Sequence, residues 1–290
     1  MNKKIIKVSV MLNDDNFNDS GDNTLTFTGL KTSVSVMFGN GALMPFAQIK
    51  IYGLKLENCL KLLRVRWNEM KALMNRVRID AGEEGGDLVK VFEGNITFAY
   101  PDMSNAPNVA LVIESQSAVF ENMKPVPSTS FEGENDVATM IETICKDMGY
   151  QFENNAVTQI IEGQYLADSS IAKIQNIAQA ADIDLYIEQN LIAIAPKGGS
   201  RNIKVPTISP KAGLIGYPTP DLRGVSFKCL YDPAIRFGGT VSISDSEITV
   251  CNGDWRVYGV DIYLDSNTPN GNWFCEVNAT FKDSANAVKK

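Results

Sequence analysis

Histidine is absent from this chain of 290 residues, and its absence excludes more enzyme chemistry than any motif in the sequence adds. Nucleophilic mechanisms built on Ser-His-Asp or Cys-His need an imidazole to move the proton. Zinc held through histidine, and iron held by two histidines and a carboxylate, are excluded for the same reason. What remains is carboxylate or lysine chemistry, and we predict no enzymatic activity, no catalytic residue, no cofactor and no metal.

Cysteine is scarce, and its spacing forms no metal or disulfide pattern. The five cysteines, which are never nearer than 22 positions to one another, are Cys59, Cys145, Cys229, Cys251 and Cys275. Neither a CxxC zinc knuckle nor a complete disulfide framework fits an odd number at these spacings. We expect reduced thiols scattered through the hydrophobic core.

Long apolar runs are also missing. No window approaches the roughly 18 apolar residues of a membrane-spanning helix. Although Met1–Ile6 resembles the charged start of a signal peptide, Lys7 interrupts the apolar run and Asn13–Asp15 ends it. We therefore expect no export signal and no membrane anchor.

Positive charge is in deficit, with 27 Lys+Arg against 34 Asp+Glu and a net charge of -7. This negative net charge disfavours a nucleic-acid-binding protein, which would need basic residues to contact the phosphate backbone. Residues 55–78 hold seven basic residues against two acids, and the seven are Lys55, Lys61, Arg64, Arg66, Lys71, Arg76 and Arg78. Residues 80–93 reverse the sign with five acids and one lysine, which suggests a complementary contact between subunits. The alternative is a solvated helix and loop.

The acidic motifs do not point to chemistry of their own. With 34 acids, a carboxylate pair spaced for glycoside cleavage cannot be refuted, but nothing supports one. Asp19–Gly21 has the letters of an aspartic-protease motif, yet it lies in the polar stretch 13–23 without a buried strand. The same stretch departs from a calcium loop at Asp19 and Leu25, and we interpret it as a solvated loop.

The first part of the chain alternates apolar and polar residues with period two. This pattern predicts half-buried strands before and after one short helix near residues 54–63. The strand segments are 6–12, 25–27, 34–38, 49–51, 77–81, 92–98 and 109–113. We predict a first β domain over residues 1–124.

After Pro125–Ser130 the apolar period changes to that of a helix. Residues 137–148 are predicted to be helical, with Asn135 as N-cap and Gly149 as stop. A second helix follows Asp168–Ser169 and leads into a hairpin that turns at Gln189–Asn190. Residues 125–196 are thus predicted to form a small α+β domain.

The remainder returns to strands after Lys197–Ser200, which we interpret as a flexible joint. Strands are predicted over 225–230, 240–244, 255–264 and 273–281, within a second β domain of residues 197–290. The predicted fold class is α+β, mainly β, with two antiparallel β-barrel-like tube domains and the small α+β insert between them.

The order of these features resembles the baseplate hub proteins of contractile-tailed phages, a family that includes the late-control-D and Mu-type hubs and the N-terminal part of VgrG spikes. The strand segments that carry the resemblance are Ile49–Leu54, Val77–Gly82 and Val91–Ile96. The helical insert, its hairpin and the closing strands also resemble the hubs, over Asp136–Tyr150, Leu166–Pro196, Asn252–Val257 and Asn270–Phe274.

This resemblance implies a homotrimer in which each chain supplies two tube-like β domains, so that three chains close a ring of six similar modules. The ring would adapt the six-fold tail tube to a three-fold central spike and would contact tape measure and baseplate wedge proteins. DNA would pass through its channel without specific binding, in keeping with the acidic balance. The resemblance further implies a late protein of a contractile injection system, assembled in the host cytoplasm and placed in the virion tail baseplate. The seven basic residues of 55–78 are the candidates for a subunit or partner interface.

Two alternatives remain open. A VgrG-like component of a secretion machine shares the ring, and the absence of a needle module after Phe281 favours the phage interpretation. A carboxylate-based tail-associated hydrolase is motivated by the many acids and by Trp255, Tyr258, Tyr263 and Trp273. Such aromatics are more often part of a core or an interface.

Overall fold

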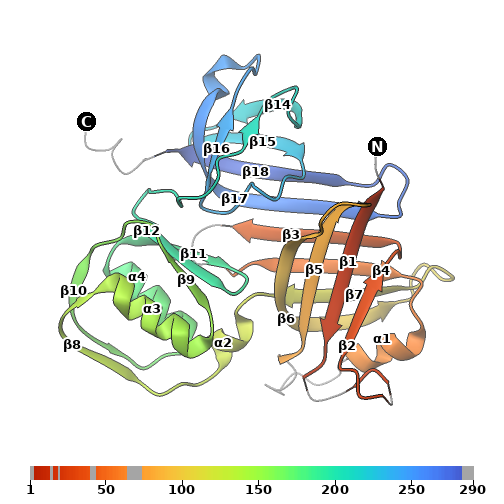
Figure 1. Cartoon of the computed structure of the whole chain (residues 1–290), viewed down its shortest axis with the longest axis horizontal. Coiled ribbons are helices and arrows are strands. Elements are labelled where there is room, and N and C mark those ends of the chain that lie inside the picture. The colour runs from red at the N-terminus through yellow and green to blue at the C-terminus, as the bar shows by residue number, and fades with distance from the viewer. Residues whose placement is uncertain (1–2, 14–15, 19, 40–43, 64–73, 283–290) are drawn as a thin grey trace. The chain divides into compact units, whose positions relative to one another are not determined.

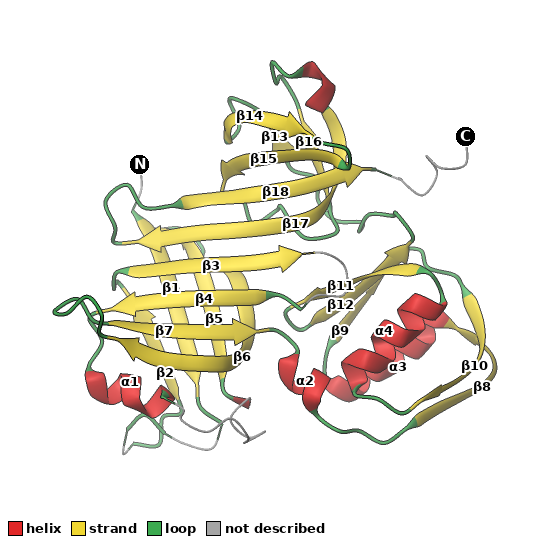
Figure 2. Ribbon diagram, turned by 180° about the vertical axis from the view of Figure 1, so that it is seen from behind, coloured by secondary structure: helices red, strands yellow, loops and turns green. Residues whose placement is uncertain are grey.

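The computed structural model describes residues 3–13, 16–18, 20–39, 44–63 and 74–282. Strands form most of the described secondary structure (Figures 1 and 2). The chain divides into two compact units, and each is described by itself. The first comprises residues 1–37, 45–120 and 262–274, and the second comprises residues 38–44, 121–261 and 275–290.

The first unit is an antiparallel sheet with one short helix. Its strands are β1 (Lys4–Met11), β2 (Thr24–Thr28), β3 (Thr32–Gly39), β4 (Phe46–Tyr52), β5 (Arg76–Glu83), β6 (Val89–Asp102) and β7 (Ala110–Gln116). They are ordered β3-β4-β7-β6-β5-β1-β2, so hairpin neighbours are joined by two long-range pairings, β4 with β7 and β1 with β5. The alternation seen in the sequence places one side of each strand in the core, as where Val8 faces Ile79 and both are fully buried.

The short helix predicted near residues 54–63 is confirmed as α1 (Leu56–Leu62). It buries Cys59 and Leu62. Leu56 and Leu60, one turn apart, are each about half exposed, at 46% and 50%. The helix therefore presents an apolar stripe outward as well as inward.

The second unit contains the predicted α+β elements. They are β8 (Thr129–Asp136), α3 (Val137–Met148), β9 (Gln151–Asn154), β10 (Ile160–Leu166), α4 (Ser170–Ala180), β11 (Ile183–Glu188) and β12 (Leu191–Pro196), after the one-turn α2 (Val119–Met123). Strands β11, β12 and β9 form one sheet, and β8 pairs with β10 in a separate ribbon. Figures 1 and 2 both draw α3 and α4 between that ribbon and that sheet.

Both predicted helices are confirmed, with one correction at the first cap. Asp136, not Asn135, caps α3, because its Oδ2 accepts the backbone N–H of Thr139 at 2.8 Å. Gly149 ends α3 in the left-handed conformation as predicted, with φ of 72°. Ser169 caps α4, and the hairpin turn falls between Glu188 and Leu191.

The rest of the second unit is again β. Its elements are β13 (Thr207–Ile208), β14 (Leu214–Pro220), β15 (Gly224–Leu230), β16 (Thr240–Ile243), the 3-10 turn η2 (Thr249–Cys251), β17 (Gly253–Ser266) and β18 (Trp273–Phe281). The last residues of β17 and the first of β18 fall within 262–274 and so belong to the first unit. The order β14-β15-β18-β17-β16-β13 makes β14 an edge strand. The sequence did not predict β14, because Gly216, Pro218 and Pro220 interrupt its pattern; proline is tolerated on a sheet edge.

The predicted fold class is confirmed only as mainly β with a few helices. Among the described strands of either unit the path of pairing is open, and no sheet closes on itself. Two barrel-like domains are therefore not confirmed. The two units are each built from three separate stretches of chain, whereas the sequence predicts three continuous domains. The predicted boundaries at 124/125 and 196/197 remain predictions.

Two other expectations concern the core and the membrane. All five cysteines are buried free thiols, as the sequence predicted. Burial raises the pKa of Cys145 to about 12, which keeps that thiol protonated and unreactive. In the part of the chain that the structure describes, no helix combines the length and apolarity needed to span a membrane.

Candidate functional site

The predicted basic residues on β5 are already paired within the chain. Arg76 Nη2 lies 2.9 Å from Glu93 Oε1. Arg78 binds both carboxylate oxygens of Asp80, at 3.0 Å through Nε and 2.7 Å through Nη2. The acids expected to attract a neighbouring subunit thus bind the arginines of their own sheet, which reduces the charge left for a partner.

Of the other predicted basic residues, the structure describes Lys55 and Lys61, which lie beside and on α1. Lys61 donates to the backbone carbonyl of Phe17 at 2.6 Å and so ties α1 to the segment between β1 and β2. Lys55 is exposed at the N-cap of α1. Arg64, Arg66 and Lys71 lie outside the described residues. An interface role for these seven residues remains a prediction.

The aromatic residues that motivated a hydrolase are mostly engaged in packing. Trp255 is 7% exposed, packs against Phe281 in a tilted arrangement with 5.1 Å between ring centroids, and donates its indole N–H to the carbonyl of Cys251. Tyr263 packs against Phe274 in a similar tilted arrangement at 5.2 Å. The core interpretation of Trp255 is confirmed.

Two carboxylates do lie on the neighbouring strands β17 and β18. Burial raises the pKa of Asp261, and the negative charge of Glu276 adds to the rise. Glu276 also pairs with Lys228 on β15 at 3.4 Å. This group is a row of charges across a sheet, and within the described residues no three or more acidic or thiol side chains are arranged to hold a metal ion.

We expect Asp261→Asn to stabilise the protein at neutral pH. The folded-state pKa of Asp261 exceeds its unfolded value of about 3.9, so the native protein loses stability as the pH rises through that range. The amide removes this cost, and Tm should rise by about 1–2 °C at pH 7 and not at pH 3. Thermal unfolding of Asp254→Asn, on the same strand, is the control. A lower Tm for Asp261→Asn at pH 7 would show that the carboxylate is a needed partner.

An exposed apolar surface on β14 and η2 is a feature that sequence reasoning missed. It comprises Ile215, Tyr217, Leu222, Ile248 and Val250, and we call it the β14–η2 surface. Leu222 is completely exposed, Val250 is 69% exposed and Tyr217 is 63% exposed. Strand β14, which carries Ile215 and Tyr217, packs on η2, which carries Val250. Leu222 lies in the turn that follows β14, and Ile248 directly precedes η2. Clustered apolar residues of this kind mark protein contact sites.

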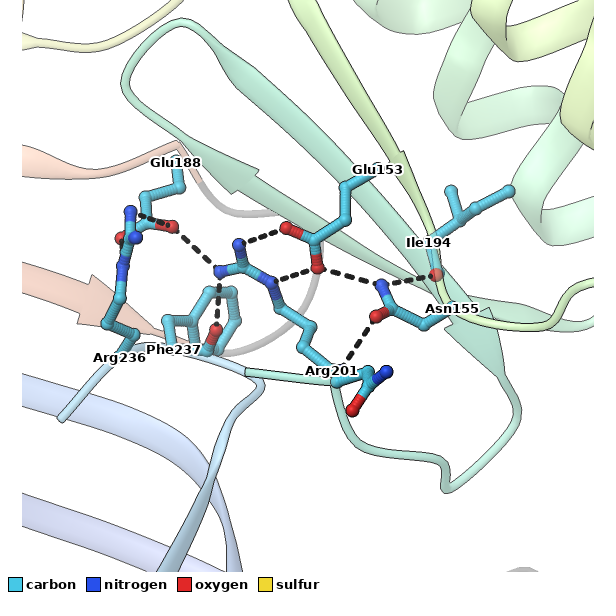
Figure 3. A network of polar contacts seen from close by, with 8 residues as sticks. Glu153, Asn155, Glu188, Ile194, Arg201, Arg236 and Phe237 are labelled. Atoms are coloured by element: carbon cyan, nitrogen blue, oxygen red, sulfur yellow. Dashed lines mark hydrogen bonds and ion pairs between the residues drawn. The ribbon is translucent and has the colours of Figure 1, made fainter. Parts of the chain in front are cut away.

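A second missed feature is a buried ion network around Arg201, which directly follows the segment 197–200 that was interpreted as a flexible joint (Figure 3). The Arg201 side chain is fully buried. Its guanidinium binds Glu153 of β9 through two hydrogen bonds, of 2.9 and 2.8 Å, and Glu188 of β11 through one of 2.7 Å. It also donates to the carbonyl of Phe237.

Further residues complete this network. Arg236 donates to Glu188 at 2.9 Å, so that one carboxylate serves two arginines. The Asn155 side chain donates to Glu153 and accepts the backbone N–H of Asn202 at 2.7 Å. The backbone N–H of Arg201 donates to Gly238, whose φ of 78° and close approach to a tyrosine ring leave no room for a Cβ.

A parallel set of bonds holds the glycines of the same segment. Asp184 accepts the backbone N–H of Gly198 at 3.0 Å and an Arg256 N–H at 2.6 Å. Tyr186 donates its hydroxyl to the carbonyl of Gly199 at 3.0 Å. The interpretation of residues 197–200 as a flexible joint is therefore wrong, because their backbone is bonded to β11 at successive positions.

The pKa shifts agree with a permanently charged network. Burial acts to lower the pKa of Arg201, but bonds and charges from Glu153 and Glu188 outweigh it and raise the pKa above its ordinary value. Hydrogen bonds from Arg201 lower the pKa of Glu153 against the opposing effect of burial. The segment 197–203 is thus fixed to the α+β elements by ion pairs of Arg201 together with hydrogen bonds of its backbone.

Solved structures of tail proteins share this fold at very low sequence identity. The 43 kDa tail protein of prophage MuSo2 from Shewanella oneidensis is 8% identical, with a TM-score of 0.64 over 96% of this chain and 99% of that chain. The tail protein of Neisseria meningitidis MC58 is 9% identical, with a TM-score of 0.61 over 95% and 96%.

A secretion protein has the same fold. The E. coli c3393 protein, a type VI secretion component described as similar to the T4 tail proteins gp27 and gp5, is 8% identical, with a TM-score of 0.60 over 86% of this chain and 73% of that chain. Identities this low establish the fold alone.

The sequence itself matches a family of known description. Among curated protein sequences, none matches this chain. The profile described as "Baseplate hub gp41" matches residues 5–274, which is nearly the whole chain. The chain therefore belongs to the family of baseplate hub proteins described as Baseplate hub gp41.

Proposed function

We propose that this baseplate hub protein assembles as a homotrimeric ring that adapts the six-fold tube of a contractile tail to a three-fold central spike. The single observation that carries the proposal is the family match over residues 5–274. The shared fold with phage tail proteins along almost the entire chain supports it. Its role is then structural, and its work is done by extended interfaces rather than by chemistry.

The partners of the ring follow from the same proposal. The tail tube would bind one face and the spike the other, with tape measure and wedge proteins alongside, and DNA would pass without specific contacts. A spike partner draws support from the fold likeness to a chain of the Francisella PdpA–VgrG complex, with a TM-score of 0.53 over 96% of this chain and 58% of that chain. Assembly would take place in the host cytoplasm.

The β14–η2 surface is our candidate for a contact within this assembly. Its apolar side chains are exposed in the single chain, and apolar side chains of this size are covered in obligate oligomers. The two prolines and the bulge of β14 remove the ladder geometry of a free edge, which favours side-chain packing over strand addition.

A measurement of solution mass tests the proposal. We expect light scattering to give three times the 31.8 kDa of one chain across a range of concentrations. Leu222→Asp should shift the protein toward the monomer by at least about tenfold in association constant, since a charge replaces a fully exposed apolar contact. Lys204→Asp, another exposed position of the second unit, should leave the mass unchanged.

Two results would contradict the proposal. If the protein stays monomeric in the presence of a tail tube and spike, it does not form the proposed trimeric ring. A trimer that is unaffected by Leu222→Asp would keep the ring but remove the β14–η2 surface from its interfaces.

A second candidate is the corresponding ring of a secretion machine. The likeness to the E. coli type VI secretion component is the observation that favours it. Genes for a capsid and tape measure beside this gene would support the phage tail, and genes for secretion sheath and effector proteins would support the alternative.

A further inference from the structure

The negative charge of this protein is concentrated in one part of the second unit. Residues 125–196 contain eleven acidic and two basic residues, a net charge of -9, although the whole chain carries only -7. Residues 1–124 are neutral overall and residues 197–290 carry +2. Hence the acidic balance belongs to the α+β elements and not to the two flanking β segments.

Within this part, the β8–β10 ribbon carries like charges face to face. Glu134 of β8 lies directly opposite Glu162 of β10 in the register of the two strands. Like charges at directly opposed positions destabilise a sheet. Among the described residues, no lysine or arginine forms an ion pair with Glu132, Glu134 or Glu162. The two basic residues of 125–196 are engaged elsewhere, Lys146 with Glu142 and Lys173 with the start of β8.

The same face of the ribbon exposes apolar side chains. Leu166 of β10 is buried, whereas Tyr165 beside it is 72% exposed and Ile160 is 61% exposed. A shallow, open depression in the same ribbon is lined by Gly133, Glu134, Glu162 and Gly163. We call the outward residues Glu134, Ile160, Glu162 and Tyr165 the ribbon face.

The ribbon face is suited to side-chain recognition rather than to addition of a strand. Asn135 donates its side-chain amide to the carbonyls of Glu132 and Gly133, and Gln164 donates to the carbonyl of Glu162. These bonds use backbone acceptors that an added strand would need. Lys173, which is 2% exposed, fixes the start of β8 by donating to Pro127 and Thr129, so the face is held in place before binding.

We propose that the ribbon face binds an extended segment of a different protein in which lysine or arginine alternates with apolar residues. A basic side chain would bind in the depression lined by Glu134 and Glu162, and its apolar neighbours would pack on Ile160 and Tyr165. The negative charges of Glu134 and Glu162 are complementary to a basic peptide, which is why we assign a basic partner to this face. A second copy of this chain is disfavoured, because the flanking segments carry net charges of only 0 and +2 and because Arg76 and Arg78 are paired within their own sheet.

A peptide of defined chemistry tests this proposal on the full chain. The probe is a labelled peptide of about ten residues, alternating arginine and valine, which is long enough to span the eight residues of β8. A peptide of the same length with glutamate in place of arginine is the reference. We expect fluorescence anisotropy to show saturable binding of the basic peptide alone, weakened by salt.

Two matched double variants distinguish binding at the ribbon face from nonspecific electrostatic attraction of the basic peptide to the acidic segment. Glu134→Gln/Glu162→Gln should weaken binding of the basic peptide by about tenfold or more, because both carboxylates that line the depression are lost. Asp147→Asn/Asp168→Asn makes the same change of charge on exposed acids of the same segment, off the ribbon face, and should change binding by less than about twofold. Tyr165→Ser should weaken the binding that persists at high salt.

Three results would contradict the proposal. If the ribbon variant binds the basic peptide as tightly as the native chain, the face is not the site. If both double variants lose affinity equally, the attraction is diffuse. A rise in solution mass that Glu134→Gln/Glu162→Gln abolishes would assign the face to a second copy instead. Thermal unfolding of the ribbon variant should show no loss of stability, since the substitution removes repulsion.

Discussion

Arg201→Met should destabilise the second unit more than any other single side-chain truncation in the network. The substitution leaves Glu153 and Glu188 without the guanidinium that binds them, and Glu188 is 6% exposed. Breaking a buried ion pair by removing one partner costs about 3–5 kcal/mol, because the remaining charge is left unpaired. We expect Tm to fall by roughly 6–20 °C for the transition of that unit. Arg223→Met, at an exposed position, should change Tm by less than about 2 °C.

The triple variant Arg201→Met/Glu153→Gln/Glu188→Gln keeps this prediction testable if the single variant does not fold. Removing all three charges abolishes the unpaired carboxylates, so much of the lost stability should return. A triple variant no more stable than the single one would show that Arg201 acts through packing and not through its charge.

The pH dependence supplies an independent check of the same network. In the native protein the folded pKa of Glu153 lies below its unfolded value of about 4.3, so its stabilisation is present above that pH and is lost as the pH falls through the folded pKa. In Arg201→Met the carboxylates lose the charge that favours ionisation. The stability difference between native and variant should therefore shrink toward acid pH.

The elements that could be predicted from the sequence are those whose signals are local. Period-two alternation located strands such as β1 and β5, and the caps and spacing of apolar residues located α3 and α4. The N-cap moved by one residue, from Asn135 to Asp136, because both side chains are competent and only the backbone geometry decides between them. Strand closure into a barrel is not encoded in any local pattern, and the expectation of barrels came from strand alternation and from the family resemblance, neither of which fixes closure.

The interaction features required knowledge of pairing across the chain. Arg201 and Glu153 are 48 positions apart, so nothing near the glycines of 197–200 indicated that this segment is held. The β14–η2 surface was hidden by the glycine and prolines that break its strand pattern. The opposition of Glu134 and Glu162 follows from the register of two strands that are separated by α3 and β9. One signal was available in the sequence, namely the excess of eleven acids over two bases in residues 125–196.

Gly224→Ala should disrupt the β part of the second unit where β15 starts beside β18. Gly224 has a φ of 153°, and a Cβ on it would lie 2.2 Å from the carbonyl oxygen of Ala279 and 2.7 Å from the Cα of Thr280. Both are backbone atoms of β18, so the strand itself would have to move. The adjoining turn resists that movement, because Asp221 accepts the N–H of Gly224 at 2.8 Å and Thr280 donates to the carbonyl of Arg223.

Overpacking and backbone strain together predict a loss of about 2–6 kcal/mol for Gly224→Ala. Chemical denaturation, which reports the free energy of unfolding, is the measurement. Gly86→Ala is the matched control, because a Cβ there meets nothing nearer than 3.5 Å, and its effect should stay within about 0.5 kcal/mol. The turn at Gly224 joins β14 to β15. The same substitution should therefore displace the β14–η2 surface and reduce trimer formation. A stable Gly224→Ala protein that forms normal trimers would mean that β15 and β18 do not approach each other as closely as the structure shows.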